Sequence, residues 1–129
     1  MNRTDFEKIV SEGIDEIPER FRKRIKNVAF LVEDEPSEEI RLRENLKPNE
    51  TLFGLYTGIP LTERGEFYGV GPVLPDTITI YQRPIEDEAY GDPKQVRRLV
   101  IDTVWHEVAH YLGLNEEEVR KREEERGVK

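Results

Sequence analysis

The sequence contains no cysteine and only two histidines among its 129 residues. Without cysteine, the chain has no disulfide scaffold, no thiolate nucleophile and no cysteine-ligated zinc or iron–sulfur site. Two histidines are also too few for a zinc site made of three histidines. Any third protein ligand to a metal must therefore be an oxygen donor.

The sequence also lacks an excess of positive charge and a long apolar run. Its 20 basic side chains are outnumbered by 28 acidic ones, giving a net charge of -8, whereas nucleic-acid binders need a basic surface for phosphate. No apolar run approaches the roughly 18 residues of a membrane-spanning helix, and the first residues show no apolar segment of the secretory type. We therefore expect a cytoplasmic protein without a nucleic-acid or membrane partner.

Charged residues make up 37% of the chain and apolar residues 36%. The two signs of charge are interspersed, which is typical of a folded protein and not of a disordered tail. A length of 129 residues suits one hydrophobic core and is too short for two ordinary domains. We therefore expect a single domain that spans residues 1–129.

Apolar spacing predicts helices at the start of the chain and strands in its middle. A first helix is predicted from Thr4, where Glu7 would complete a capping box, and Pro18 is expected to end it and open a second short helix. Strands are predicted at residues 28–32, 52–56 and 77–82, with a short helix or ordered loop at 37–46 and a long loop at 58–75.

The clearest helix is predicted at residues 93–112. Asp92 suits the N-cap, Pro93 suits the first helical position, and Gly113 suits the C-terminal stop. A polar helix is expected to follow from Asn115.

Both histidines lie in one pentapeptide of this helix, His106-Glu107-Val108-Ala109-His110. Side chains four residues apart lie on one helical face, so the two imidazoles can bind one cation. Zinc suits them, because two imidazoles and one further protein ligand leave a position for water. From its place after the first histidine, Glu107 can take a proton from water that zinc activates. The same pattern also occurs by chance in helices that bind no metal.

Glu116 is the first candidate for the third ligand. The segment reads His106-x-x-x-His110-x-x-Gly113-x-x-Glu116, and in extended zinc-peptidase motifs a glycine at this offset ends the helix and a ligand follows three residues later. Acidic residues at 116–118 are also favoured by a helix dipole alone. Glu117 or a carboxylate elsewhere in the chain therefore remains an alternative.

The neighbours of the histidine pair have ordinary structural interpretations. Trp105 and Tyr111 are expected to pack, although a tyrosine near zinc can also support an oxyanion. Asp102 is expected to be solvated, with orientation of a histidine ligand as the alternative. The arginines at 97–98 are expected to be surface charges.

Beyond these motifs, the chain resembles the small bacterial zincin-like metallopeptidases, also called minimal zincins. The segments that carry the resemblance cover most of the chain and are Ile17-Pro18, Asn27-Val28, residues 32–36, residues 52–64 with the block Leu55-Tyr56-Thr57-Gly58-Ile59-Pro60-Leu61-Thr62-Glu63-Arg64, residues 74–78 and residues 103–114. The resemblance implies an α+β zincin-like fold with a mixed sheet and an active-site helix. It also implies that His106 and His110 are metal ligands and that Glu107 is the catalytic base. The family usually has aspartate where this chain has Glu116.

The combined interpretation is an α+β domain with an N-terminal helical pair, a small mixed sheet and a metal-binding helix at 93–112. We predict a zinc-dependent peptidase in which one Zn²⁺ ion, held by His106, His110 and Glu116, activates water against a peptide or protein substrate, with Glu107 as general base. Because substrate peptides often pair with an edge strand, residues 77–82 are the expected edge above the site.

Two other functions stay open at this point. The first is a metal-binding regulatory or interaction module that keeps the site without turnover. The second is metal-dependent hydrolysis of nucleic acid, which needs a basic groove near the helix and is disfavoured by the acidic balance.

Overall fold

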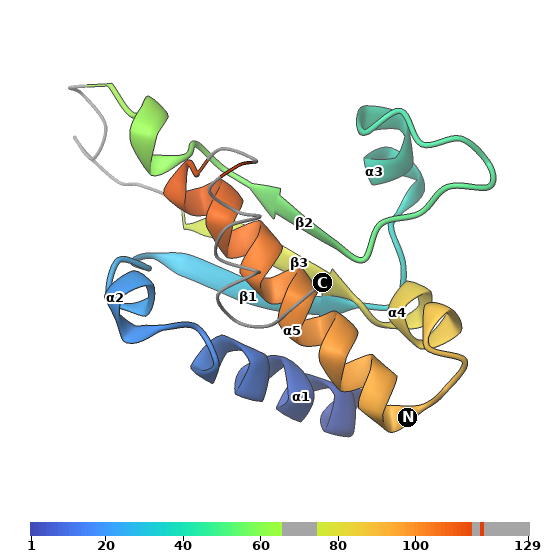
Figure 1. The fold of residues 1–129 in the computed structure, drawn as a ribbon. Coiled ribbons are helices and arrows are strands. Elements are labelled where there is room, and N and C mark those ends of the chain that lie inside the picture. The colour runs from blue at the N-terminus through green and yellow to red at the C-terminus, as the bar shows by residue number, and fades with distance from the viewer. Residues whose placement is uncertain (66–74, 115–116, 118–129) are drawn as a thin grey trace.

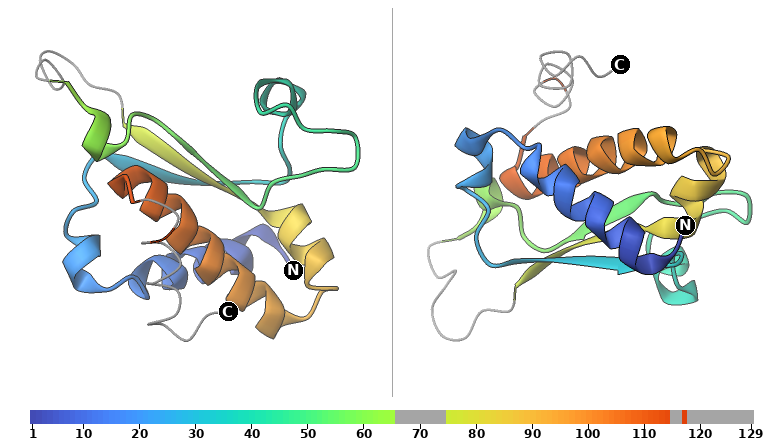
Figure 2. Two further views of the ribbon diagram at one scale, coloured as in Figure 1. Left: turned by 45° about the horizontal axis from the view of Figure 1, so that its top comes forward. Right: turned by 90° about the horizontal axis from the view of Figure 1, so that it is seen from below.

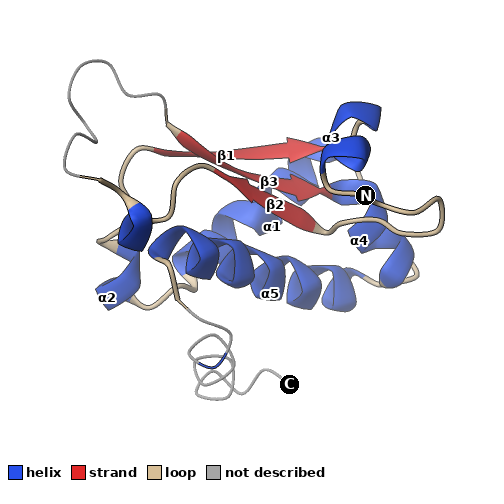
Figure 3. Ribbon diagram, turned by 90° about the horizontal axis from the view of Figure 1, so that it is seen from above, coloured by secondary structure: helices blue, strands red, loops and turns tan. Residues whose placement is uncertain are grey.

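The computed structural model describes residues 1–65, 75–114 and 117, and consists of a sheet with helices packed on one face (Figures 1 and 2). Two long helices lie side by side on that face, α1 (Arg3–Asp15) and α5 (Pro93–Leu112). The shorter helical segments are α2 (Glu19–Arg22), α3 (Glu38–Arg43), the 3₁₀ turn η1 (Leu61–Glu63) and α4 (Gln82–Glu88). Figure 3 shows α3 beyond the end of the sheet toward which β1 points.

The sheet contains three strands, β1 (Val28–Glu33), β3 (Asp76–Tyr81) and β2 (Gly54–Thr57), in this spatial order. β1 is parallel to β3, and β2 is antiparallel to it. The predicted α+β fold with a small mixed sheet and a helix carrying His-Glu-x-x-His is therefore confirmed.

The prediction that residues 77–82 form the edge of the sheet is wrong. β3 lies in the middle, bonded to β1 on one side and to β2 on the other. Its alternating pattern reports one buried face and contains no information about neighbouring strands. The edge next to α5 is β2, and Gln82 belongs to α4.

The helices confirm most of the sequence prediction. α5 has the predicted bounds, and Pro18 separates α1 from α2. The segment 37–46 contains the helix α3, whose N-cap Ser37 accepts a hydrogen bond from a backbone N–H.

Two details of the helices differ from prediction. The N-cap of α1 is Asn2, whose side chain accepts from the Asp5 N–H at 2.8 Å, while the predicted cap Thr4 lies inside the helix. Both residue types suit an N-cap, so local preference alone did not decide between them. The short helix α4 was not expected, since it spans only seven residues and is too short to show a helical period.

The hydrophobic core lies between the sheet and the helices. Ile78 and Ile80 of β3 are fully buried beneath α5. Trp105 of α5 packs against Phe21 with ring centroids 5.4 Å apart, which agrees with its expected packing role. No helix in the described part of the chain is long and apolar enough to cross a membrane.

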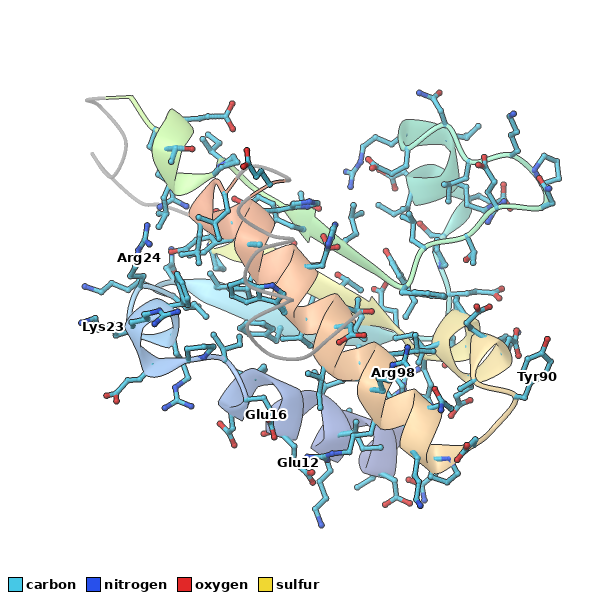
Figure 4. The ribbon with its side chains drawn as sticks, viewed as in Figure 1. Glu12, Glu16, Lys23, Arg24, Tyr90 and Arg98 are labelled. Atoms are coloured by element: carbon cyan, nitrogen blue, oxygen red, sulfur yellow. The ribbon has the colours of Figure 1, made fainter. Side chains whose placement is uncertain are left out.

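The position of α5 on α1 is supported by ion pairs at the surface. Arg97 pairs with Glu12 of α1 and lies 3.9 Å from a carboxylate oxygen of Glu16, the C-cap residue of that helix. Figure 4 labels both glutamates. Arg97 therefore connects the two helices as well as facing solvent, whereas Arg98 is exposed as expected.

Replacing the glycine that ends α5 is expected to destabilise the fold. Gly113 has a φ of 78°, in the left-handed region, and a Cβ there would overlap the Thr62 side chain. We expect Gly113→Ala to lower the free energy of unfolding by about 1–3 kcal/mol in urea denaturation. Gly65→Ala is the matched control, because nothing lies within 4 Å of its Cβ position. Equal free energies for the two variants would contradict this account.

Candidate metal centre

His106, Glu107 and His110 lie together on the last turns of α5. Each residue offers a ligand atom, and these atoms all lie within 4.8 Å of one another. The two imidazole rings meet edge to face with centroids 4.7 Å apart. Both histidines are half-buried, whereas Glu107 is only 7% exposed. The helix therefore brings the predicted residue pattern into one cluster with the donor types that zinc prefers.

Glu107 contacts the edge strand as well as the helix. Its Oε1 accepts a hydrogen bond of 2.8 Å from the Tyr56 backbone N–H, and it lies 3.5 Å from His110 Nδ1. The N–H donor fixes the carboxylate in place, and a carboxylate has further lone pairs with which to accept a proton.

The Tyr56 N–H points to the open side of β2. The Phe53 carbonyl, just before the strand, accepts from the Tyr81 N–H at 2.8 Å and so faces β3. Alternate residues of a strand direct their backbone groups to the same side. Gly54 and Tyr56 therefore direct theirs away from β3, toward the side on which Glu107 lies.

Gly54 allows the edge strand to lie directly against α5. A Cβ at this position would be 2.7 Å from Thr103 Cγ2 and 3.3 Å from Glu107 Cγ. A side chain of any size would push β2 away from the helix, because backbone and helix side chains already meet there. Neither Gly54 nor Tyr56 is a predicted site residue, and the one signal for them in the sequence is their place in the segment 52–64, which carries the family resemblance.

A cleft of about 870 Å³ opens beside His106 and Glu107. It is lined by residues from α3, the segment 48–54, α4 and α5. Asp102 and Thr103 of α5 line it next to the histidine. Asp102 is half-buried there, so it is a residue of the cleft wall more than a solvated surface residue.

The predicted third ligand, Glu116, lies outside the described residues. Glu117 is described and exposed, but it is not part of the cluster. Among residues 1–65, 75–114 and 117, the cluster around the histidine pair contains no carboxylate other than Glu107. Gly113 ends α5 in the left-handed conformation, which is the helix end that a ligand at position 116 is predicted to follow.

Tyr111 does not face the histidine cluster. Its ring is buried, and its hydroxyl accepts from the Lys26 N–H at 3.2 Å and donates to the Lys26 carbonyl at 3.1 Å. The hydroxyl thus anchors the segment before β1. Its packing role agrees with expectation, and the alternative role in supporting an oxyanion is wrong.

Comparison with known proteins agrees with this geometry. A family model described as zincin-like metallopeptidase matches residues 25–126, which include all three strands and α5. The resemblance inferred from the sequence is thereby confirmed. A comparison with curated proteins finds no match.

The contact between β2 and α5 can be tested at Gly54. We expect Gly54→Ala to lower the free energy of unfolding by about 1–3 kcal/mol, because the added methyl group overlaps Thr103 Cγ2. Thr103→Ser removes that methyl group, so the double variant should regain part of the loss in thermal or urea denaturation. If Thr103→Ser lowers the free energy of unfolding of Gly54→Ala by as much as it lowers that of the wild type, overlap with Thr103 is not the reason that position 54 requires glycine.

Proposed function

The chain belongs to the zincin-like metallopeptidase family, and we propose on this premise that it is a zinc-dependent peptidase. The observation that carries the proposal is the cluster of two imidazoles and one carboxylate within 4.8 Å, beside a cleft of about 870 Å³. A cleft of this size can hold several residues of an extended peptide.

The donor set fits zinc. Two histidine nitrogens and an oxygen ligand are a common catalytic zinc site, and we propose that His106, His110 and Glu116 hold the ion. When bound, zinc lowers the pKa of a water ligand toward about 7 and polarises a carbonyl group.

Glu107 supplies the proton transfers in this proposal. Its carboxylate takes the proton that the attacking water loses and delivers it to the nitrogen of the leaving amine. The Tyr56 N–H holds Oε1 during both steps, so the carboxylate needs no reorientation between them.

The edge strand β2 offers a backbone for substrate binding. Gly54 and Tyr56 direct their carbonyl groups to the open side of the sheet, next to Glu107, whereas the Tyr56 N–H stays bound to Glu107 and is not offered to a substrate. We propose that an extended peptide lies along this edge, as in other complexes in which a peptide adds a strand to a sheet. β2 takes the place of β3, which the sequence analysis had assigned to this role.

The charge of the cleft favours basic substrates. Besides Glu107, five acidic side chains line it (Glu35, Glu50, Asp87, Glu88 and Asp102), against two arginines (Arg41 and Arg83). Arg83 lies 3.5 Å from Glu35, so this pair contributes little net charge. The remaining excess of carboxylates attracts lysine and arginine side chains of a peptide.

The metal and the base can be tested separately. We expect purified protein to bind about one zinc ion per chain and to cleave an unstructured protein substrate. His106→Gln and His110→Gln should each lose both zinc and activity. Glu107→Gln should keep zinc and lose activity by about 10²–10⁴-fold, since it removes the proton acceptor. Zinc content is read by atomic absorption and cleavage by mass spectrometry.

Glu12→Gln is the control for this series, because it also removes a glutamate charge but lies on α1. It should retain zinc and cleavage. Protein that binds no stoichiometric zinc after dialysis against the metal would overturn the proposal. Zinc binding without any cleavage would leave the regulatory module as the function.

The charge preference has its own test. We expect a peptide rich in lysine and arginine to have a kcat/KM roughly tenfold above that of the matched acidic peptide at low salt. The ratio should fall as salt increases, because exposed charges are screened. The double variant Asp87→Asn/Glu88→Gln should reduce the ratio. A ratio that does not respond to salt or to this variant would refute an electrostatic origin.

A further inference from the structure

Tyr56 is bound at both ends. Its backbone N–H donates to Glu107 at 2.8 Å, and its hydroxyl donates to Asp76 Oδ2 at 2.7 Å. Asp76 begins the central strand β3 and is only 6% exposed. One residue of the edge strand thus connects the proposed catalytic base with a buried carboxylate on the neighbouring strand.

Asp76 also forms a part-buried ion pair. Arg64 Nη2 donates to the same Asp76 Oδ2 at 2.7 Å, and the arginine side chain is 17% exposed. Burial raises the pKa of the Tyr56 hydroxyl, and the Asp76 carboxylate raises it further. The hydroxyl therefore stays protonated and keeps donating to Asp76 at any physiological pH.

Arg64 fastens the segment that follows β2. Its Nε donates to the Ile59 carbonyl at 2.8 Å, and its guanidinium carbon lies 5.5 Å from the centre of the Tyr111 ring on α5. Gly58 lies against the Asp76 carboxyl group, where any Cβ would overlap it. The residues from Tyr56 to Arg64 therefore form a closed loop around Asp76.

This loop also contacts the end of the metal-binding helix. Thr62 of η1 occupies the space that a Cβ at Gly113 would need. The Tyr56 ring meets the Tyr111 ring edge to face at 6.1 Å. The loop is thus packed against α5 both at its C-cap and through Tyr111, one residue beyond His110.

A buried ion pair is a poor source of stability. Removing two charges from water costs several kcal/mol, and apolar residues of similar volume often stabilise a fold as well or better. What such a pair offers is a defined geometry, because an unsatisfied charge penalises any displacement. Here that geometry fixes the strand whose N–H holds Glu107.

We propose that Asp76 and Arg64 are positioning residues for Glu107, acting through Tyr56 and the loop that they close. The pair holds the edge strand at the distance from α5 at which the Tyr56 N–H orients the carboxylate. This role rests on the proposed peptidase function. The positioning role gives a reason for the residue types in the block from Leu55 to Arg64, which zinc chemistry alone does not require.

The test removes one contact at a time. Tyr56→Phe deletes the hydroxyl and leaves the ion pair intact, and Asp76→Asn removes the charge that holds Arg64. We expect each to lower kcat about tenfold, as is typical for residues that orient a catalytic group, with KM and zinc affinity unchanged. Should Asp76→Asn fail to fold, Tyr56→Phe still tests the positioning role, because it removes only one oxygen atom.

Amide exchange measured by NMR gives a readout that does not depend on activity. In the wild type, the residue-56 N–H is protected by its bond to Glu107, and Glu107→Ala should expose it. We expect Tyr56→Phe and Asp76→Asn to speed its exchange about tenfold. Glu12→Gln, which removes the carboxylate of another arginine pair far from β2, should change neither this exchange nor kcat.

A merely structural role predicts a different result. The variants would then lower the melting temperature but keep both the wild-type kcat and the wild-type exchange rate at residue 56, and this outcome would overturn the inference. If the wild type cleaves no peptide, the peptidase function fails by itself. The exchange rates then still establish or refute the connection from Asp76 to Glu107.

Discussion

The hydrogen bond from the Tyr56 N–H to Glu107 is the constraint on which the site depends. Glu107 is only 7% exposed, so its carboxylate needs a donor. An edge-strand N–H that points away from the sheet needs an acceptor. Each group satisfies the other, so the edge strand β2 and the helix α5 have one favourable relative position. Gly54 makes that position sterically accessible, because the backbone of β2 and the side chains of α5 meet there without an intervening Cβ.

The rest of the fold holds these two elements in place from opposite sides. β2 is bonded to the central strand β3, whose isoleucines are buried beneath α5. α5 lies against α1 and is tied to it by Arg97, so it is held along its length as well as at the site. Its caps, Asp92 and Gly113, determine where it begins and ends. A helix and a strand held in this way are what the proposed role of Glu107 needs, since the carboxylate would accept and deliver a proton without rearrangement.

Charge is distributed differently on the two sides of this contact. Next to β2, Asp76 and Arg64 neutralise each other in a part-buried cluster with Tyr56, where precise geometry matters more than stabilisation. On the side of the cleft, carboxylates outnumber arginines and remain accessible to a ligand. Part of the net charge of -8 therefore lies in the cleft, where we propose that a substrate binds. The Asp76–Arg64 pair adds no net charge to the cleft, because its two charges are opposite.

The sequence by itself determined the bounds of α5 and the pairing of His106 with His110, because helical period, caps and four-residue spacing are local properties. It also indicated the strands and the mixed α+β class. It did not determine which strand forms the edge, since alternation is the same in a central strand and in an edge strand. The contact between Tyr56 and Glu107 joins residues 51 positions apart, and the Asp76–Arg64 pair joins β3 to the loop that follows β2. Only the tertiary structure decided these contacts, because they depend on how strands and helices pack, which no local pattern encodes.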